Sequence, residues 1–187
     1  MFDIENFKHD CIQAAASAQS APELIKDIVR EAILPSHGIF SALGEPREAG
    51  VSTLYHSQAL TVLNIVWGPQ MKVFPHDHRM WAVIGICSGR EDNAFYRRSP
   101  EGLTLVNSRG LEPNDVIILG PKVIHSVTNP SRKFTSAIHV YGGDFFSTPR
   151  SEWDEETLAE RPYDVNHLKR LFEQSNAVQV SENEKND

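Results

Sequence analysis

The stretch His76-Asp77-His78, inside the run Met71–Gly89, decides how this chain of 187 residues is interpreted. On a β-strand successive side chains alternate between the two faces, so residues two apart point the same way. His76 and His78 are therefore expected to project side by side from one strand. A third imidazole from a neighbouring strand would complete one face of a metal ion.

Two further histidines lie in apolar, strand-like segments. His125 stands in Val123–Val127 and His139 in Ala137–Tyr141. Of the two, His125 has the spacing from the first pair that is expected of a third ligand. Neutral imidazole binds Fe, Zn, Cu and Ni, so the ligand set leaves the metal open. Three protein ligands leave coordination positions free, which is typical of a catalytic metal ion rather than a structural one.

Composition and charge argue against several classes of function. The net charge of −7 disfavours a nucleic-acid-binding surface, and no cluster of Lys or Arg contradicts this. Cys11 and Cys87 lie far apart and match no metal-binding or redox spacing, so a disulfide scaffold is not expected. No apolar run approaches the roughly 18–20 residues that span a bilayer, and Met1–Glu5 lacks the basic start of a signal peptide. The expected location is the cytoplasm.

The first third of the chain is predicted to be helical. Phe2–Gln19 is alanine-rich, and Ala21–Leu34 repeats apolar residues at helical spacing, with Pro22 near its start. Ser41–Gly50 is predicted to be a loop. Residues 1–50 are therefore expected to form a helical extension that packs on the barrel formed by the residues after it.

From Val51 the sequence changes to short apolar segments separated by turn residues, which predicts an all-β sandwich or barrel over residues 51–150. The expected strands are Leu60–Trp67, Trp81–Cys87, Ala94–Arg97, Leu103–Asn107, Val116–Leu119, His125–Thr128 and Thr135–Tyr141. Residues 151–187 are expected to form a C-terminal segment with one short helix near Val165–Phe172 and a disordered end at Ser181–Asp187.

The pattern of metal ligands resembles the cupin superfamily over about half of the chain. The first cupin motif runs from a His-x-His pair to an acidic ligand and then a glycine. Here an apolar residue, Ala82 or by another count Val83, stands at the acidic position, and Gly89 closes the motif. The second motif ends in His-x-x-x-Asn, which His125 and Asn129 match. The resemblance implies a double-stranded β-helix, or jelly-roll barrel, with the helical extension at its N-terminus.

A cupin site of three histidines without a carboxylate is similar to that of the thiol dioxygenases, the cysteine and 3-mercaptopropionate dioxygenases. Those enzymes carry Ser-x-His-x-Tyr on a later strand. The matching segment here has Ala137, His139 and Tyr141, so the histidine and tyrosine are retained and the serine is not. The resemblance implies a non-haem Fe(II) site that oxidises a small thiol to a sulfinate. The tyrosine hydroxyl, held by the histidine, would orient a ligand beside the metal.

Two features of the family are missing. Animal cysteine dioxygenases have a cysteine shortly after the His-x-His pair that crosslinks to the tyrosine; Cys87 is at odd spacing from the pair and is expected to point away from the ligands. Those enzymes also bind the substrate carboxylate with an arginine upstream of the first motif, and Val51–Ser57 contains none. Arg79, Arg97 or Arg98 are the alternative candidates. Without such a clamp, the sequence predicts no preference for cysteine over a carboxylate-free thiol of similar size.

These observations lead to one expectation and two alternatives. We expect a cupin barrel that binds Fe(II) through His76, His78 and His125, with Tyr141 and His139 as catalytic residues and with a small thiol and dioxygen as substrates. Ni, Zn or Mn would suit the same ligands in a purified sample. The alternatives are another three-histidine cupin oxygenase, which cleaves a diketone or flavonol, and a non-catalytic ligand-sensing cupin. A homodimer formed through a sheet edge, as in many cupins, is compatible with the sequence, and no nucleic-acid or membrane partner is expected.

Overall fold

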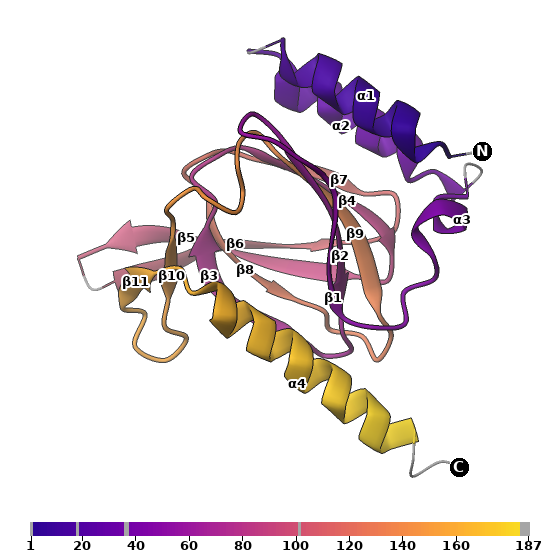
Figure 1. The fold of residues 1–187 in the computed structure, drawn as a ribbon. Coiled ribbons are helices and arrows are strands. Elements are labelled where there is room, and N and C mark those ends of the chain that lie inside the picture. Colours follow the sequence, from indigo (N-terminus) through magenta and orange to yellow (C-terminus); the bar gives the residue numbers. More distant parts are fainter. Residues whose placement is uncertain (1, 18, 36–37, 101, 184–187) are drawn as a thin grey trace.

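The computed structural model describes four ranges of the chain, residues 2–17, 19–35, 38–100 and 102–183. In chain order the helices are α1 (Ile4–Ala15), α2 (Ala21–Ala32), α3 (Phe40–Leu43) and α4 (Val165–Asn183). The strands are β1 (Gly50–His56), β2 (Thr61–Trp67), β3 (Lys72–Asp77), β4 (Ala82–Ser88), β5 (Glu91–Ser99), β6 (Gly102–Leu111), β7 (Val116–Leu119), β8 (Ile124–Thr128), β9 (Thr135–Tyr141), β10 (Ser151–Trp153) and β11 (Glu160–Pro162). The strands form a barrel between the two N-terminal helices and α4 (Figure 1).

The strand pairing defines the fold. Two antiparallel sheets have the orders β1-β2-β9-β4-β7 and β11-β10-β3-β8-β5-β6. Consecutive strands from β2 to β5 alternate between the sheets, and those from β6 to β9 alternate on the way back. Each strand of the first arm pairs with its counterpart in the second: β2 with β9, β3 with β8, β4 with β7 and β5 with β6. A long hairpin wound in this way is a double-stranded β-helix, which confirms the predicted fold.

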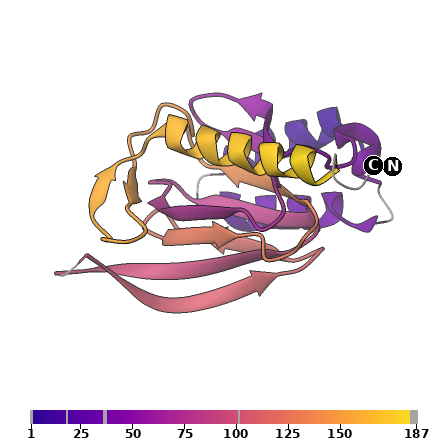
Figure 2. The ribbon, with the colours of Figure 1, turned by 90° about the horizontal axis from the view of Figure 1, so that it is seen from below.

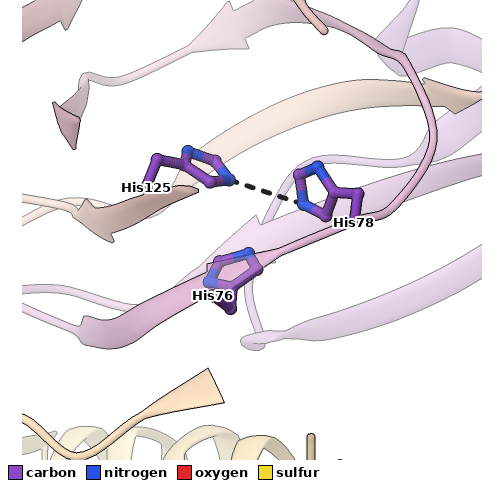
Figure 3. Close-up of side chains that lie close together, drawn as sticks. All are labelled: His76, His78 and His125. Carbon is purple, nitrogen blue, oxygen red and sulfur yellow. Dashed lines mark hydrogen bonds between the residues drawn. The ribbon is translucent and has the colours of Figure 1, made fainter. Parts of the chain in front are cut away.

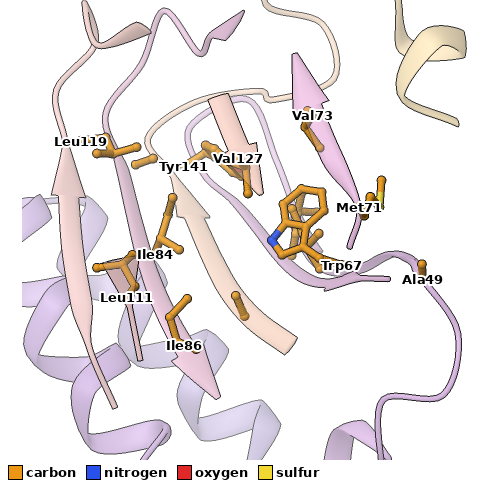
Figure 4. Close-up of a cluster of buried hydrophobic side chains, with 14 of the residues drawn as sticks. Ala49, Trp67, Met71, Val73, Ile84, Ile86, Leu111, Leu119, Val127 and Tyr141 are labelled. Carbon is orange, nitrogen blue, oxygen red and sulfur yellow. The ribbon is translucent and has the colours of Figure 1, made fainter. Parts of the chain in front are cut away.

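Both faces of the five-stranded sheet are covered, which explains why β2 and β9 are buried along their whole length. Because side chains alternate, Leu63 and Ile84 point into the core between the two sheets, which Figure 4 shows around Ile84. Val62 and Val83 point the other way and pack against the N-terminal helices. Cys87 packs with this helix-facing cluster, as its odd spacing from the histidine pair predicts.

Helix α4 runs past β3 and β1 at an open side of the barrel (Figures 1 and 2). The ring of Phe172 stacks on Trp67, with centroids 5.7 Å apart, and the Asn176 side chain bonds both backbone groups of Ala49. The sequence predicts that this helix ends near Phe172. In the structure it continues to Asn183, and the contact of Asn176 with Ala49 stabilises the part beyond Phe172. It also includes residues 181–183 of the predicted disordered end; residues 184–187 of that segment lie outside the described residues.

Several elements differ from those predicted. The short helix α3 lies where the sequence predicts a loop, and β1, β10 and β11 are strands that the sequence does not predict. Strand β3 is predicted only as the strand that carries the histidine pair, without bounds. Strand β3 ends at Asp77, so that His78 follows the strand rather than lying on it. Among the described residues, no helix is both long and apolar enough to cross a membrane.

Candidate metal centre

Three histidine side chains converge inside the barrel where β3 pairs with β8 (Figure 3). His76 stands opposite His125 in the register of the two strands, and His78 follows directly after β3. One ligand nitrogen of each ring lies within 4.8 Å of the other two, and all three residues are buried. The structure thus brings together the three histidines that the sequence predicts as ligands. Within the described chain, no carboxylate joins this group.

Hydrogen bonds at Nδ1 fix the orientation of two of the rings. The Nδ1–H of His76 donates to the backbone carbonyl of Phe74 over 2.9 Å. The Nδ1–H of His125 donates to Oδ1 of Asn93 over 2.7 Å, since the amide NH₂ of Asn93 donates elsewhere. Each ring therefore directs an unprotonated Nε2 into the cavity, which is the tautomer that binds a metal ion.

The spacing and charge of the rings fit a metal ion. Nε2 of His125 lies 3.4 Å from Nε2 of His78. Two nitrogens at about 2.1 Å from one ion, in a tetrahedral arrangement, would be separated by about 3.4 Å. Burial lowers the pKa of His76 to about 4, and burial together with neighbouring histidines holds the pKa values of His78 and His125 well below 6.5. All three rings are therefore neutral at neutral pH, as metal binding requires.

The predicted pair His139 and Tyr141 lines the same cavity as the three histidines. The Tyr141 hydroxyl lies 3.0 Å from Nδ1 of His139, and the Tyr141 ring centroid lies 5.0 Å from that of His78. Burial lowers the pKa of His139 to about 3 and raises the pKa of Tyr141 above its ordinary value. Both side chains are therefore neutral at neutral pH. Tyr141 therefore presents a protonated phenol hydroxyl in the cavity that the three histidines line.

The arginines considered from the sequence do not reach the cavity. Asp77, between the two histidines of the pair, pairs through its carboxylate with Nε of Arg79 at 2.6 Å. Arg98 lies beside the same carboxylate and pairs with Glu160 at 2.7 Å. Arg97 is exposed. None of the three arginines is among the residues that line the cavity.

Arg150, which sequence reasoning missed, lies close to the site. Its guanidinium stacks on the rings of Phe145 and Tyr163, at 4.0 and 4.1 Å from their centroids, and both rings line the metal cavity. Its positive charge contributes to lowering the pKa values of His76 and His78. Its Nε is buried and has no hydrogen-bond partner among the described residues. The loop sequence around Arg150 contains no motif that indicates a role in the site. Only the folded chain places it over the ring of Tyr163, beside the cavity.

A groove of about 860 Å³ adjoins the metal cavity on the side of α4. Four residues line both spaces and form the boundary between them: Val51, Phe145, Tyr163 and Leu168. The cavity is much smaller than the groove, with a volume of about 30 Å³. These boundary side chains therefore lie between the groove and the histidines.

Glu91 is a second residue that sequence reasoning missed. It begins β5, is fully buried, and accepts hydrogen bonds from Trp67 and Asn93. Asn93 in turn accepts from His125, so the carboxylate is connected to a candidate ligand. The cupin pattern does not indicate it, because the acidic position of the first motif falls on Ala82 or Val83, on a different strand.

No protein-family model matches the chain. Among solved structures, it is similar to an RmlC-like cupin with a double-stranded β-helix fold from Methanocaldococcus jannaschii (10% identity, 55% of this chain, 86% of that chain, TM-score 0.45). It is also similar to a cupin superfamily protein from Desulfitobacterium hafniense (17% identity, 56% and 87%, TM-score 0.44). A third similar structure, of the DMSP lyases RdDddP and RnDddQII, has 19% identity and a TM-score of 0.41; the match covers 52% of this chain and 46% of that one. The chain itself combines a double-stranded β-helix with a buried group of three histidines that can hold a metal ion.

Proposed function

We propose that the protein is a non-haem iron(II) dioxygenase that oxidises a small thiol to a sulfinate. The observation that carries this proposal is the buried group of three histidines without a carboxylate, adjoined by the bonded pair His139 and Tyr141. The overall reaction joins one thiol and one dioxygen molecule into one sulfinic acid, with every atom retained. Iron(II), when bound by the three imidazoles, would supply the redox chemistry between the two substrates.

The chain's own residues would bind, orient and enclose the substrate. His76, His78 and His125 would hold the metal and leave coordination positions free. Tyr141 is placed to hydrogen-bond the substrate, while His139 holds its hydroxyl in position. The remaining walls of the cavity are largely apolar and would exclude water during the reaction: Val51, Ile65, Trp67, Val73, Val127, Phe145 and Leu168.

Arg150 changes the expected substrate preference. The sequence predicts no preference for a carboxylate-bearing thiol, because no arginine stands upstream of the first motif. Arg150 lines the adjoining groove and not the cavity itself, and it supplies a cation next to Phe145 and Tyr163, which line both spaces. A charge-assisted hydrogen bond to a carboxylate contributes about 1.5–3 kcal/mol, so Arg150→Met should lower kcat/KM for such a thiol by roughly 10- to 150-fold. Lys169→Met, which changes an exposed cation of the same groove, is the matched control and should have a much smaller effect.

The first experiment measures metal binding. Protein purified without an affinity tag is analysed for bound metals, stripped with a chelator and titrated anaerobically with Fe(II). We expect one ion per chain in the native protein and none in His125→Ala. His9→Asn, which changes an exposed histidine of α1, should bind as the native protein does. Equal binding by His125→Ala would contradict the proposed site.

The second experiment measures oxygen consumption by the iron-loaded protein. The panel contains cysteine, 3-mercaptopropionate, cysteamine and 2-mercaptoethanol, with a flavonol and a β-diketone as alternative substrates. We expect thiol-dependent oxygen uptake and a product that mass spectrometry shows to have gained two oxygen atoms. Uptake with the flavonol or diketone alone would replace the thiol proposal by the other oxygenase function. No uptake with any compound, despite full iron loading, would favour a ligand-sensing protein.

A further inference from the structure

Glu91 is a carboxylate enclosed in the barrel, with 0% of its surface exposed. Its Oε2 accepts a hydrogen bond from Nε1 of Trp67 over 2.7 Å, and its Oε1 accepts one from Nδ2 of Asn93 over 2.9 Å. Both donors are neutral side chains. A buried carboxylate without a strong cationic partner is unfavourable for folding, and such groups are concentrated at functional sites.

One chain of hydrogen bonds connects Glu91 to the metal site. Because the NH₂ of Asn93 donates to Glu91, its Oδ1 must face the other way and accept from Nδ1–H of His125. The distance between Oδ1 and Nδ1 is 2.7 Å, a short hydrogen bond. Glu91 therefore fixes the orientation of the Asn93 amide, and the amide fixes the proton on His125. The Nε2 atom of His125 is left unprotonated for the metal.

A second path leads from Glu91 to Tyr141. Nε2 of His139 lies 3.8 Å from Oε2 of Glu91 and has no hydrogen-bond partner among the described residues, although it is buried. Facing a carboxylate whose oxygens both accept, this nitrogen is more stable as N–H than as a lone pair. Nδ1 of His139 then carries the lone pair and accepts from the Tyr141 hydroxyl at 3.0 Å.

We propose that Glu91 is a positioning residue that sets the protons on both sides of the metal site, on His125 through Asn93 and on Tyr141 through His139. The inference rests on the three-histidine metal site of the proposed function, and it adds a residue that no motif marks. It predicts that the Tyr141 hydrogen points to His139. The phenol oxygen is then free to accept a hydrogen bond from a ligand in the cavity.

The charges in the barrel are consistent with this role. The pKa of Glu91 is raised overall, because burial outweighs the opposing effect of the hydrogen bonds from Asn93 and Trp67. Three neutral imidazoles leave the double positive charge of a divalent ion uncompensated. In a low-dielectric interior, that charge would favour the ionised carboxylate. Metal binding and the ionised form of Glu91 therefore support each other.

The first test reads the tautomers directly in the native protein. The full chain is labelled with ¹⁵N-histidine and loaded with Zn(II), which binds imidazole and is diamagnetic. Two-bond ¹⁵N–¹H correlations show which nitrogen of each ring is protonated. We expect His125 to be protonated at Nδ1 and His139 at Nε2 only. Protonation of His139 at Nδ1 would overturn the path from Glu91 to Tyr141, and this result requires no variant.

The second test separates the two paths. Glu91→Gln keeps the side-chain size but leaves one acceptor for two donors, so we expect zinc affinity to fall by about 10- to 100-fold and the His139 tautomer to become mixed. Asn93→Ala interrupts only the path to His125. It should weaken zinc binding by a similar factor and leave the His139 tautomer as in the native protein.

Asp92→Asn is the matched control, because Asp92 precedes Asn93 on the same strand and pairs with Arg90 instead. It should alter neither zinc affinity nor tautomer. A folded Glu91→Gln protein with native zinc affinity and native His139 tautomer would overturn the proposal. If this variant does not fold, the tautomers of His125 and His139 measured in the native protein test the proposal by themselves. Zinc affinity and tautomer are measured without any thiol, so failure of the dioxygenase proposal would leave both readouts valid.

Discussion

Acidification of the metal-free protein tests the buried, neutral state of the cluster. Burial lowers the pKa of His76 from 6.5 to about 4 and that of His139 to about 3, and it holds the pKa values of His78 and His125 well below 6.5. Below pH 6.5 the unfolded chain takes up protons that the folded chain does not. The free energy of unfolding therefore falls as pH falls from about 6.5 toward the folded-state pKa values.

The size of this fall in the free energy of unfolding follows from the difference in bound protons between the unfolded and folded chains. At pH 5.5 an unfolded-state histidine is about nine-tenths protonated, whereas the folded-state rings of His76 and His139 are neutral, which costs between about 1 and 2 kcal/mol for each of these two rings. The rings of His76 and His139 together cost about 3 kcal/mol, a substantial part of the ~5–15 kcal/mol stability of a typical domain, and the lowered pKa values of His78 and His125 act in the same direction. Burial raises the pKa of Glu91, which acts in the opposite direction. A comparison of single histidine variants with the native protein removes that contribution.

The assay is urea unfolding of chelator-treated protein at pH 7.5, 6.5 and 5.5, followed by circular dichroism. Between pH 7.5 and 5.5, His76→Gln and His139→Gln should each lose between about 1 and 2 kcal/mol less stability than the native protein. Packing and hydrogen bonding that the substitution itself removes cancel in this difference, because they are absent at both pH values. His9→Gln, on the exposed face of α1, should lose as much as the native protein. Equal losses in His76→Gln and the native protein would refute the reasoning.

The remaining predictions concern the site and its support. His125→Ala should abolish iron binding and oxygen uptake together, since the two remaining ligands come from one short segment; iron content and an oxygen electrode measure this. Tyr141→Phe should retain iron but lose turnover by roughly 10²-fold, because one positioned hydroxyl is deleted. Gly142→Ala should lower the free energy of unfolding by about 1–3 kcal/mol, since a Cβ there would overlap the Trp81 ring. Native stability of Gly142→Ala in urea unfolding would contradict this packing.

The parts of the site that local periodicity encodes could be predicted from the sequence. Residues two apart on a strand share a face, so the side-by-side placement of His139 with Tyr141, both on β9, follows from the order of the residues alone. His78 lies beside His76 as predicted, although it follows the end of β3 instead of lying on the strand. The antiparallel pairing that brings His125 opposite His76 came instead from the resemblance to cupins. The structure has both arrangements.

The features that could not be predicted from the sequence depend on contacts between distant segments of the chain. Glu91 and Arg150 are charged residues with no motif around them, and their sequence context is that of ordinary surface charges. Only the pairing of β5 with β8 places Glu91 near His125, through Asn93 opposite Val127. Helix α4 was predicted too short for the same reason. Contacts such as those of Phe172 with Trp67 stabilise it, and the local sequence is merely polar and acidic.

The register of β3 against β8 links the fold to the chemistry. His76 faces His125 in this register, while Asp77, one residue later, points to the opposite side and binds Arg79. A slip by one residue would bring the carboxylate into the cavity and move an imidazole out of it. Asp77 also accepts a hydrogen bond over 2.8 Å from the backbone N–H of Ser151 on β10, and this contact with another strand favours the register in which only nitrogen ligands face the metal. In this way a charge outside the cavity helps to keep carboxylates out of the ligand set.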